Sequence, residues 1–129
     1  MKLFEEASKI VIKVGSSFLI DPKTGAVQES WLDAFVDDVA DLVKSGKKIV
    51  VVVSGSVAIG CHKLGINMLK AKLQEKQNAS VFGQHQLMHL YQDSFSRHGI
   101  EVAQALLTTE DIENRKRFLS IKTIIDYLL

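Results

Sequence analysis

The sequence predicts an α/β fold in which a parallel β-sheet is sandwiched by helices, in a Rossmann-like arrangement of three layers. Residues 10–14 and 49–53 are rich in β-branched side chains, and each run leads into a turn of small residues. Such runs are typical of strands buried on both faces of a parallel sheet. Segments with helical periodicity follow each run, as expected when crossover helices join parallel strands.

The first half of the chain is predicted to contain two strands and one helix. A strand over residues 9–14 is followed by a loop over residues 15–29, which contains the only proline. Ser30 is predicted to cap a helix over residues 31–44, because a serine hydroxyl can accept a hydrogen bond from the first helical turn. A second strand is predicted over residues 47–53. In a parallel sheet, both strands would end at the same edge.

The second half is predicted to contain three helices and a third strand. A short helix is expected over about residues 56–64, and a long helix over residues 69–97. Gly83 interrupts the long helix. A glycine there costs about 1 kcal/mol relative to alanine, so it usually has a packing reason. A strand over residues 100–107 and a last helix over residues 112–128 complete the pattern.

The order of these elements predicts a truncated fold. A crossover helix normally leads the chain back to another parallel strand, and no strand follows the predicted last helix. Apolar surface left without a partner in this way is expected to give marginal stability or association with another chain.

Composition and charge exclude several classes of function. The formal net charge of +1 gives no basic field for nucleic acid or for an anionic membrane. Cys61 is the only cysteine, which rules out an intrachain disulfide, and it is expected to be a small core residue. The chain lacks both the apolar stretch of a signal peptide and the roughly 20 apolar residues that span a bilayer. A cytoplasmic protein of one domain is therefore expected.

A lysine and two turns of small residues predict a phosphate site at the ends of the first two strands. Lys13 is the second-last residue of the first strand, and the turns lie at residues 15–17 and 54–56. Backbone N–H groups of such turns can bind an anion, and a lysine can neutralise the charge on a phosphoryl group in transfer. Two alternatives stay open: the lysine extends into solvent, or the glycines only serve the geometry of tight turns.

Sequence patterns for other kinds of catalytic or binding site give weaker evidence than the predicted phosphate site. The sequence lacks the GxGxxG and GxxxxGK[ST] patterns of dinucleotide-binding folds and Walker-type NTPases. His85 and His89 have the i, i+4 spacing that can hold a metal, but no third ligand is evident, so a solvated helix face is expected and no metal site is predicted. Ser54 and Ser56 lack the GxSxG pattern of an esterase nucleophile.

A set of short motifs runs through the chain from about residue 9 to residue 129. The motifs are Lys13-Val14-Gly15-Ser16-Ser17, Val53-Ser54-Gly55-Ser56-Val57-Ala58-Ile59-Gly60, Leu64-Gly65, Glu75-Lys76-Gln77, Gly83-Gln84-His85-Gln86-Leu87-Met88, residues 99–108, Arg115, Arg117-Phe118-Leu119 and Thr123. Together they resemble the glutamate 5-kinases, a group within the amino-acid kinase family. The resemblance implies transfer of the γ-phosphoryl group of ATP, with Mg²⁺, to the side-chain carboxylate of glutamate, which begins proline biosynthesis.

The resemblance also implies roles for individual residues. Lys13 would be the catalytic lysine that stabilises the phosphoryl group in transfer. The remaining implied positions are Gly15, Ser16 and Ser17 for phosphate, and Ser54, Gly55 and Gln84 for the glutamate substrate.

Members of this family are longer than the present chain. The resemblance therefore implies that residues 1–129 are the amino-terminal, glutamate-binding part of an amino-acid kinase domain, without its nucleotide-binding half. Alone, the chain is expected to bind no cofactor tightly and to be inactive. The expected partners are glutamate and ATP, with either a second copy of the chain or the missing carboxy-terminal half, and neither nucleic acid nor a membrane.

Two other readings stay open at this stage. The first is an inactive, truncated α/β remnant that binds an anion or an amino acid. The second is an unrelated α/β module that binds anions and has no kinase ancestry.

Overall fold

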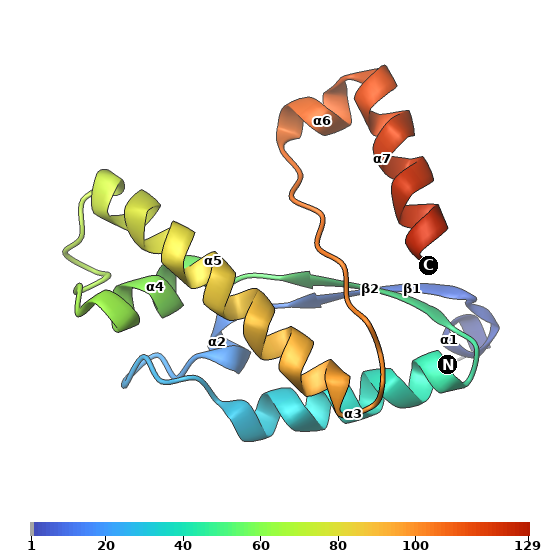
Figure 1. Cartoon of the computed structure of the whole chain (residues 1–129), viewed down its shortest axis with the longest axis horizontal. Helices are drawn as coiled ribbons and strands as arrows, with labels where there is room; N and C mark the ends of the chain where they lie inside the picture. Colours follow the sequence, from blue (N-terminus) through green and yellow to red (C-terminus); the bar gives the residue numbers. More distant parts are fainter. Residues whose placement is uncertain (1) are drawn as a thin grey trace.

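The computed structural model describes residues 2–129 as a sheet of two parallel strands with helices packed mainly on one of its faces (Figure 1). In chain order, the elements within this range are α1 (Lys2–Glu6), β1 (Lys9–Val14), α2 (Ser16–Leu19), α3 (Glu29–Lys44), β2 (Lys48–Val53), α4 (Ser56–Leu64), α5 (Leu73–Ser96), α6 (Thr109–Glu113) and α7 (Arg115–Leu128).

The two strands pair in parallel over their whole length. Their register places Lys9 opposite Lys48 and Val14 opposite Val53. This confirms both predicted strands and their parallel direction, with β2 beginning one residue later than expected. The carboxyl ends of the strands therefore lie at the same edge of the sheet, where α2 and α4 begin (Figure 1).

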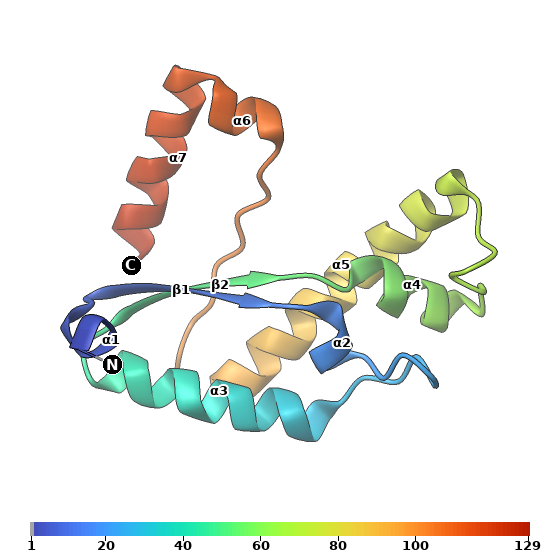
Figure 2. The same cartoon turned by 180° about the vertical axis from the view of Figure 1, so that it is seen from behind.

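The apolar core lies on one face of the sheet, where α3 and α5 run (Figure 2). Its buried members are Leu19, Ile20, Leu32, Val36, Val39, Ile59, Leu87, Tyr91 and Phe95. Ile12 of β1 and Ile49 and Val51 of β2 pack against this cluster from the strands. Cys61, on α4, is also buried, as predicted for a core residue. The α/β class expected from the sequence is thus confirmed.

The opposite face of the sheet is only partly covered. The side chains of Val11 and Val52 point to this face and are 68% and 47% exposed. In both views α6 and α7 lie on this side (Figures 1 and 2), and α7 contacts β1 through a hydrogen bond of 2.7 Å from Lys9 Nζ to Asp126 Oδ1. The expectation that the strands are buried on both faces is therefore wrong at these positions, because helices of the core cover only one side.

Further expectations about elements are also wrong. The predicted long helix begins at Leu73 rather than at residue 69, and the predicted loop over residues 15–29 contains α2. Residues 100–107 form no strand; Ile100 and Val102 pack against the core, but the backbone of this stretch pairs with no strand. The last helix is divided into α6 and α7 at Asn114, whose side-chain oxygen accepts hydrogen bonds from the first turn of α7. Ser30 is not a cap, because α3 already begins at Glu29.

Within residues 2–129, no helix has both the length and the apolar character needed to cross a bilayer.

Candidate functional site

The two predicted turns lie against each other at the carboxyl edge of the sheet. A Cβ atom on Gly55 would lie 3.5 Å from the Cβ atom of Ser16. The hydroxyl of Ser54 donates a hydrogen bond of 3.3 Å to the carbonyl oxygen of Val14, which ties the end of β2 to the end of β1. The structure therefore brings residues 15–17 and residues 54–56 together, as the parallel register requires.

Lys13 lies beside the first of these turns. Its side chain is exposed on the partly covered face of the sheet. Its amine nitrogen is 3.8 Å from the position that a Cβ atom of Gly15 would take. None of the ion pairs within residues 2–129 includes Lys13, so its amine is not paired with a carboxylate of this range. A ligand with negative charge can therefore reach this amine.

The start of α4 adds a second source of positive potential. Gly55 occupies the N-cap position of α4, and no side chain caps this end of the helix. Backbone N–H groups in the first turn of a helix lack partners within the helix and favour an anion. Because Gly55 touches Ser16, the uncapped end of α4 faces the turn at residues 15–17.

Close packing of α4 against α5 fixes the position of this helix end. A Cβ atom on Gly83 of α5 would overlap the carbonyl oxygen of Ser56. One turn further on, a Cβ atom on Gly60 of α4 would overlap the carbonyl oxygen of Ala79. The close packing predicted for Gly83 is thus confirmed, and it places α5 beside the first residue of α4.

The far end of α5 is fixed to α3 by polar contacts. The hydroxyl of Ser94 donates to Asp33 Oδ1 at 2.6 Å. Arg97 Nη2 lies 3.0 Å from Asp37 Oδ1, and His98 Nε2 lies 2.7 Å from the same oxygen. The hydrogen bond with His98, together with the positive charge of Arg97, holds the pKa of the Asp37 carboxyl below its usual value.

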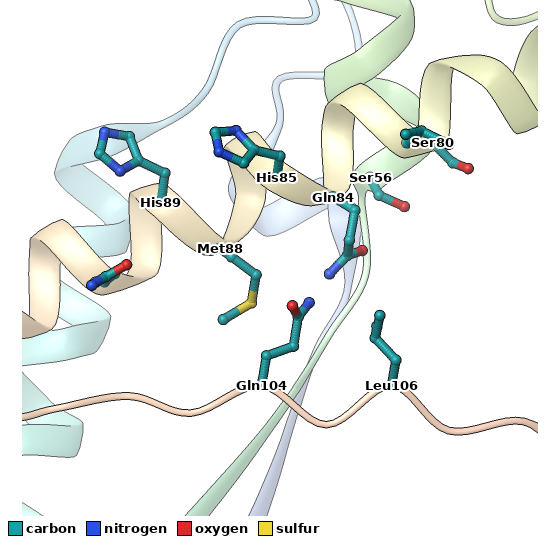
Figure 3. Close-up of a pocket in the computed structure, with 10 residues that line it drawn as sticks. Ser56, Ser80, Gln84, His85, Met88, His89, Gln104 and Leu106 are labelled. Carbon is teal, nitrogen blue, oxygen red and sulfur yellow. The ribbon is translucent and has the colours of Figure 1, made fainter. Parts of the chain in front are cut away.

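A cavity of about 610 Å³ opens between α5 and the extended segment that follows it (Figure 3). Ten residues line it: Ser56, Ser80, Val81, Gln84, His85, Met88, His89, Gln92, Gln104 and Leu106. Of the residues that the sequence assigned to the site, Gln84 lines this cavity, together with Ser56 from the turn at residues 54–56. Lys13, Gly15, Ser16, Ser17, Ser54 and Gly55 lie outside its lining, at the neighbouring edge. Ser56 connects the two regions, because it lines the cavity and follows Gly55.

Sequence reasoning missed Gln104 as a site residue. The sequence predicts a strand over the stretch around it, and no local pattern marks one residue of a strand as facing a cavity. Only the path of residues 100–108 past α5 brings Gln104 opposite Gln84 (Figure 3).

The two histidines of α5 also line the cavity. His89 Nε2 lies 3.2 Å from Asp93 Oδ2. Within residues 2–129, no three histidine, cysteine, aspartate or glutamate side chains converge as ligands of a metal ion.

Comparison with known proteins shows the family to which the chain belongs. Residues 8–129 match the amino acid kinase family. The chain is 47% identical over 126 residues to a glutamate 5-kinase of Caulobacter vibrioides, 43% identical over 123 residues to one of Paramagnetospirillum magneticum, and 41% identical over 124 residues to one of Pelagibacter ubique.

These alignments cover 98%, 95% and 96% of the present chain and 33% of each relative. The chain thus spans about a third of the length of the curated relatives it matches. A match over residues 8–129 contradicts the reading as an unrelated anion-binding module. The chain belongs to the amino acid kinase family.

Proposed function

We propose that this chain forms the glutamate-binding part of a glutamate 5-kinase. The reaction would transfer the γ-phosphoryl group of ATP to the side-chain carboxylate of L-glutamate, giving glutamyl 5-phosphate for proline biosynthesis in the cytoplasm. One observation carries the proposal: Lys13 and the two turns lie at one edge of the sheet in a chain that is 47% identical to a protein named glutamate 5-kinase.

The residues at this edge suit the charge that such a reaction develops. A carboxylate oxygen of glutamate would attack the γ-phosphorus, and the bond from this phosphorus to the bridging oxygen of ADP would break. Catalysis of this kind depends on positioning and on neutralising the charge of the phosphoryl oxygens. Lys13 supplies a positive charge for these oxygens, and the backbone at Gly15, Ser16 and Ser17 offers N–H groups beside it.

Ser54 and Gly55 would hold the acceptor. The hydroxyl of Ser54 donates to Val14, and its oxygen can still accept a hydrogen bond. Gly55 has no side chain, so a ligand can approach its backbone directly beside Ser54. Gln84 extends the proposed substrate site along α5.

No residue within 2–129 is assigned to Mg²⁺. Magnesium is usually bound through one or two carboxylates together with substrate phosphates and water. Within residues 2–129, no three histidine, cysteine, aspartate or glutamate side chains converge on one point. No step of the proposed reaction is therefore assigned to a metal ligand of this chain.

A graft enzyme tests the proposal. In it, this chain replaces the matching 126-residue segment of the Caulobacter vibrioides relative. We expect glutamate-dependent release of ADP, and trapping of the acyl phosphate by hydroxylamine as a hydroxamate. The parent enzyme is the positive control. A folded graft enzyme without turnover would reject the kinase proposal and favour an α/β module that binds an anion or an amino acid without catalysis.

A further inference from the structure

The cavity beside α5 has a lining of polar and apolar side chains that carries almost no charge. None of its ten lining residues is a lysine, arginine, aspartate or glutamate, and the only ionisable ones are His85 and His89. The cavity is open to solvent, and Gln104 and Leu106 are among its exposed members. Its lining offers amide dipoles and no full charge from lysine, arginine, aspartate or glutamate. It therefore suits a polar group whose own charges sum to zero better than a net anion or a net cation, which would find no charged partner there.

Two amides from different parts of the chain face each other across this cavity. The side chain of Gln84 points from α5 toward the extended segment, and the side chain of Gln104 points back toward α5 (Figure 3). The amides of Gln28 and Gln74 are hydrogen-bonded to Ser17 and Asn78. Within residues 2–129, the amides of Gln84 and Gln104 make no such bond, as is also true of Gln77, Gln86 and Gln92. Gln84 and Gln104 are distinguished by facing each other across the cavity.

A pair of free amides matches the head group of an α-amino acid. Each side-chain amide offers two N–H donors and one carbonyl acceptor. The N–H donors can bind the α-carboxylate, while the carbonyl oxygen can accept from the α-ammonium. A zwitterionic head group thus satisfies both halves of each amide and brings no net charge into the cavity.

The cavity also lies where such a head group is needed. Ser56 lines the cavity and is bonded to Gly55, which faces the turn at residues 15–17. A ligand with its head group between Gln84 and Gln104 can extend past Ser56, so that its other end approaches the edge with Lys13. Val102 packs against the core and anchors the segment that carries Gln104.

We propose that Gln104, opposite Gln84, binds the α-amino-acid head group of the phosphoryl acceptor and so selects an amino acid over a simple dicarboxylate. The nature of the acceptor rests on the proposed function, whereas the head-group site rests on the cavity. Gln104 is here a substrate-binding residue that determines specificity.

A binding experiment on the ¹⁵N-labelled 129-residue chain tests this proposal by NMR. L-Glutamate is the probe, and glutarate, which lacks the amino group, is its matched competitor, each up to about 10 mM, above the usual range of KM values. We expect L-glutamate to shift the side-chain amide signals of Gln84 and Gln104 and to leave the exposed Gln77 unchanged. Glutarate should bind at least about tenfold more weakly, because it leaves the amide carbonyls without a donor.

Variants make the test specific. Gln104→Leu should weaken glutamate binding about tenfold, through loss of its hydrogen bonds. Gln77→Leu makes the same chemical change on the exposed side of α5 and should leave the affinity unchanged. If the NMR spectrum of Gln104→Leu shows that this variant is unfolded, Gln104→Asn replaces it in the test, because it shortens the side chain and keeps the amide.

Three results would overturn the proposal: no shift of the Gln104 amide with L-glutamate, equal affinity for glutarate, or unchanged affinity in Gln104→Leu. These outcomes are distinct from failure of the kinase proposal. Glutamate binding at Gln104 without turnover of the graft enzyme rejects the kinase function alone. Turnover of the graft enzyme with no response at Gln104 rejects the head-group site alone.

Discussion

Gly15 and Gly55 occupy the two facing turns for different physical reasons. Gly55 has a φ of +124°, a conformation that L side chains rarely adopt, so the fold itself requires glycine there. Gly15 has a φ of −74°, and a Cβ atom on it would meet its nearest neighbour at 3.8 Å, an ordinary contact. The fold alone would therefore accept a side chain at residue 15, and we propose approach of a ligand as the reason for glycine.

Gly15→Ala should consequently separate stability from activity. We expect the free energy of unfolding of the chain to change by less than about 0.5 kcal/mol, since the new methyl group fits. Turnover of the graft enzyme should fall about tenfold or more, because the methyl group would displace the phosphate from its N–H donors. Urea unfolding and a coupled ADP assay measure the two effects. Turnover equal to that of the unsubstituted graft enzyme would show that phosphate does not approach residue 15.

Asp37 gives the stability of the chain a dependence on pH. The pKa of its carboxyl is lowered in the folded chain, first by the hydrogen bond with His98. Because the pKa of Asp37 is lower in the folded chain than in the unfolded chain, its ionised carboxylate stabilises the fold at pH values above the unfolded-state pKa of about 3.9. This stabilisation is lost as the pH falls through the folded pKa.

Asp37→Asn should therefore be less stable than the unsubstituted chain near pH 6, and this difference should shrink below about pH 4. Urea unfolding at a series of pH values measures it. Asp38→Asn is the control, because within residues 2–129 Asp38 joins none of the ion pairs that link α3 to α5. A stability difference that is the same at every pH would contradict the assignment to Asp37.

At the scale of elements, the crossing of α4 and α5 decides where the uncapped end of α4 points. Gly83 and Gly60 let the two backbones touch at Ser56 and Ala79. A rigid backbone carbonyl cannot move aside as the end of a flexible side chain can. Loss of either glycine must therefore shift a whole helix.

Gly83→Ala is expected to destabilise the chain by about 2 to 3 kcal/mol, the usual effect of overpacking a tight interface. Urea unfolding monitored by circular dichroism measures the change. Gln77→Ala, an exposed position on the same helix, should change stability by less than about 0.5 kcal/mol. If Gly83→Ala unfolds at the same urea concentration as the unsubstituted chain, the two helices do not cross as described.

The sequence predicted those elements whose signals are local. β1 and β2 are β-branched runs that end at turns, and both were predicted to within a residue. Residues 100–107 have the side-chain pattern of a strand, but a strand also needs a neighbour for its backbone, and that depends on the whole fold. The break at Asn114 was missed because its side chain competes with the backbone as a cap.

The residues of the candidate site show the same difference between local sequence signals and dependence on the whole fold. Facing turns at residues 15–17 and 54–56 follow from parallel strands, so the sequence was sufficient to bring them together. Gln104 could not be predicted, because its place in the cavity depends on the path of an irregular segment past α5.

At the scale of the whole molecule, the partly covered face of the sheet leaves apolar surface exposed. Val11 and Val52 are exposed there, and only one side of the sheet carries the core. Exposed apolar strand surface favours association with another chain.

We expect the chain to self-associate through this face. Its mass in sedimentation should rise with concentration, and Val11→Lys should keep it monomeric by placing a charge in the contact. Leu69→Lys is the control, because it makes the same kind of change at a residue that is 90% exposed and lies between α4 and α5. A mass that is constant at all concentrations, or an equal effect of Leu69→Lys, would count against association through the sheet.

The most direct measurement of the central claim compares Lys13→Met with Lys48→Met in the graft enzyme. Both lysines are exposed on β1 and β2, but Lys48 lies at the opposite end of the sheet from the two turns. If Lys13 neutralises the phosphoryl group in transfer, Lys13→Met should lower turnover by at least about 100-fold without loss of stability, and Lys48→Met should change it by less than about twofold. Turnover that survives in folded Lys13→Met, or that falls equally in both variants, would contradict the account.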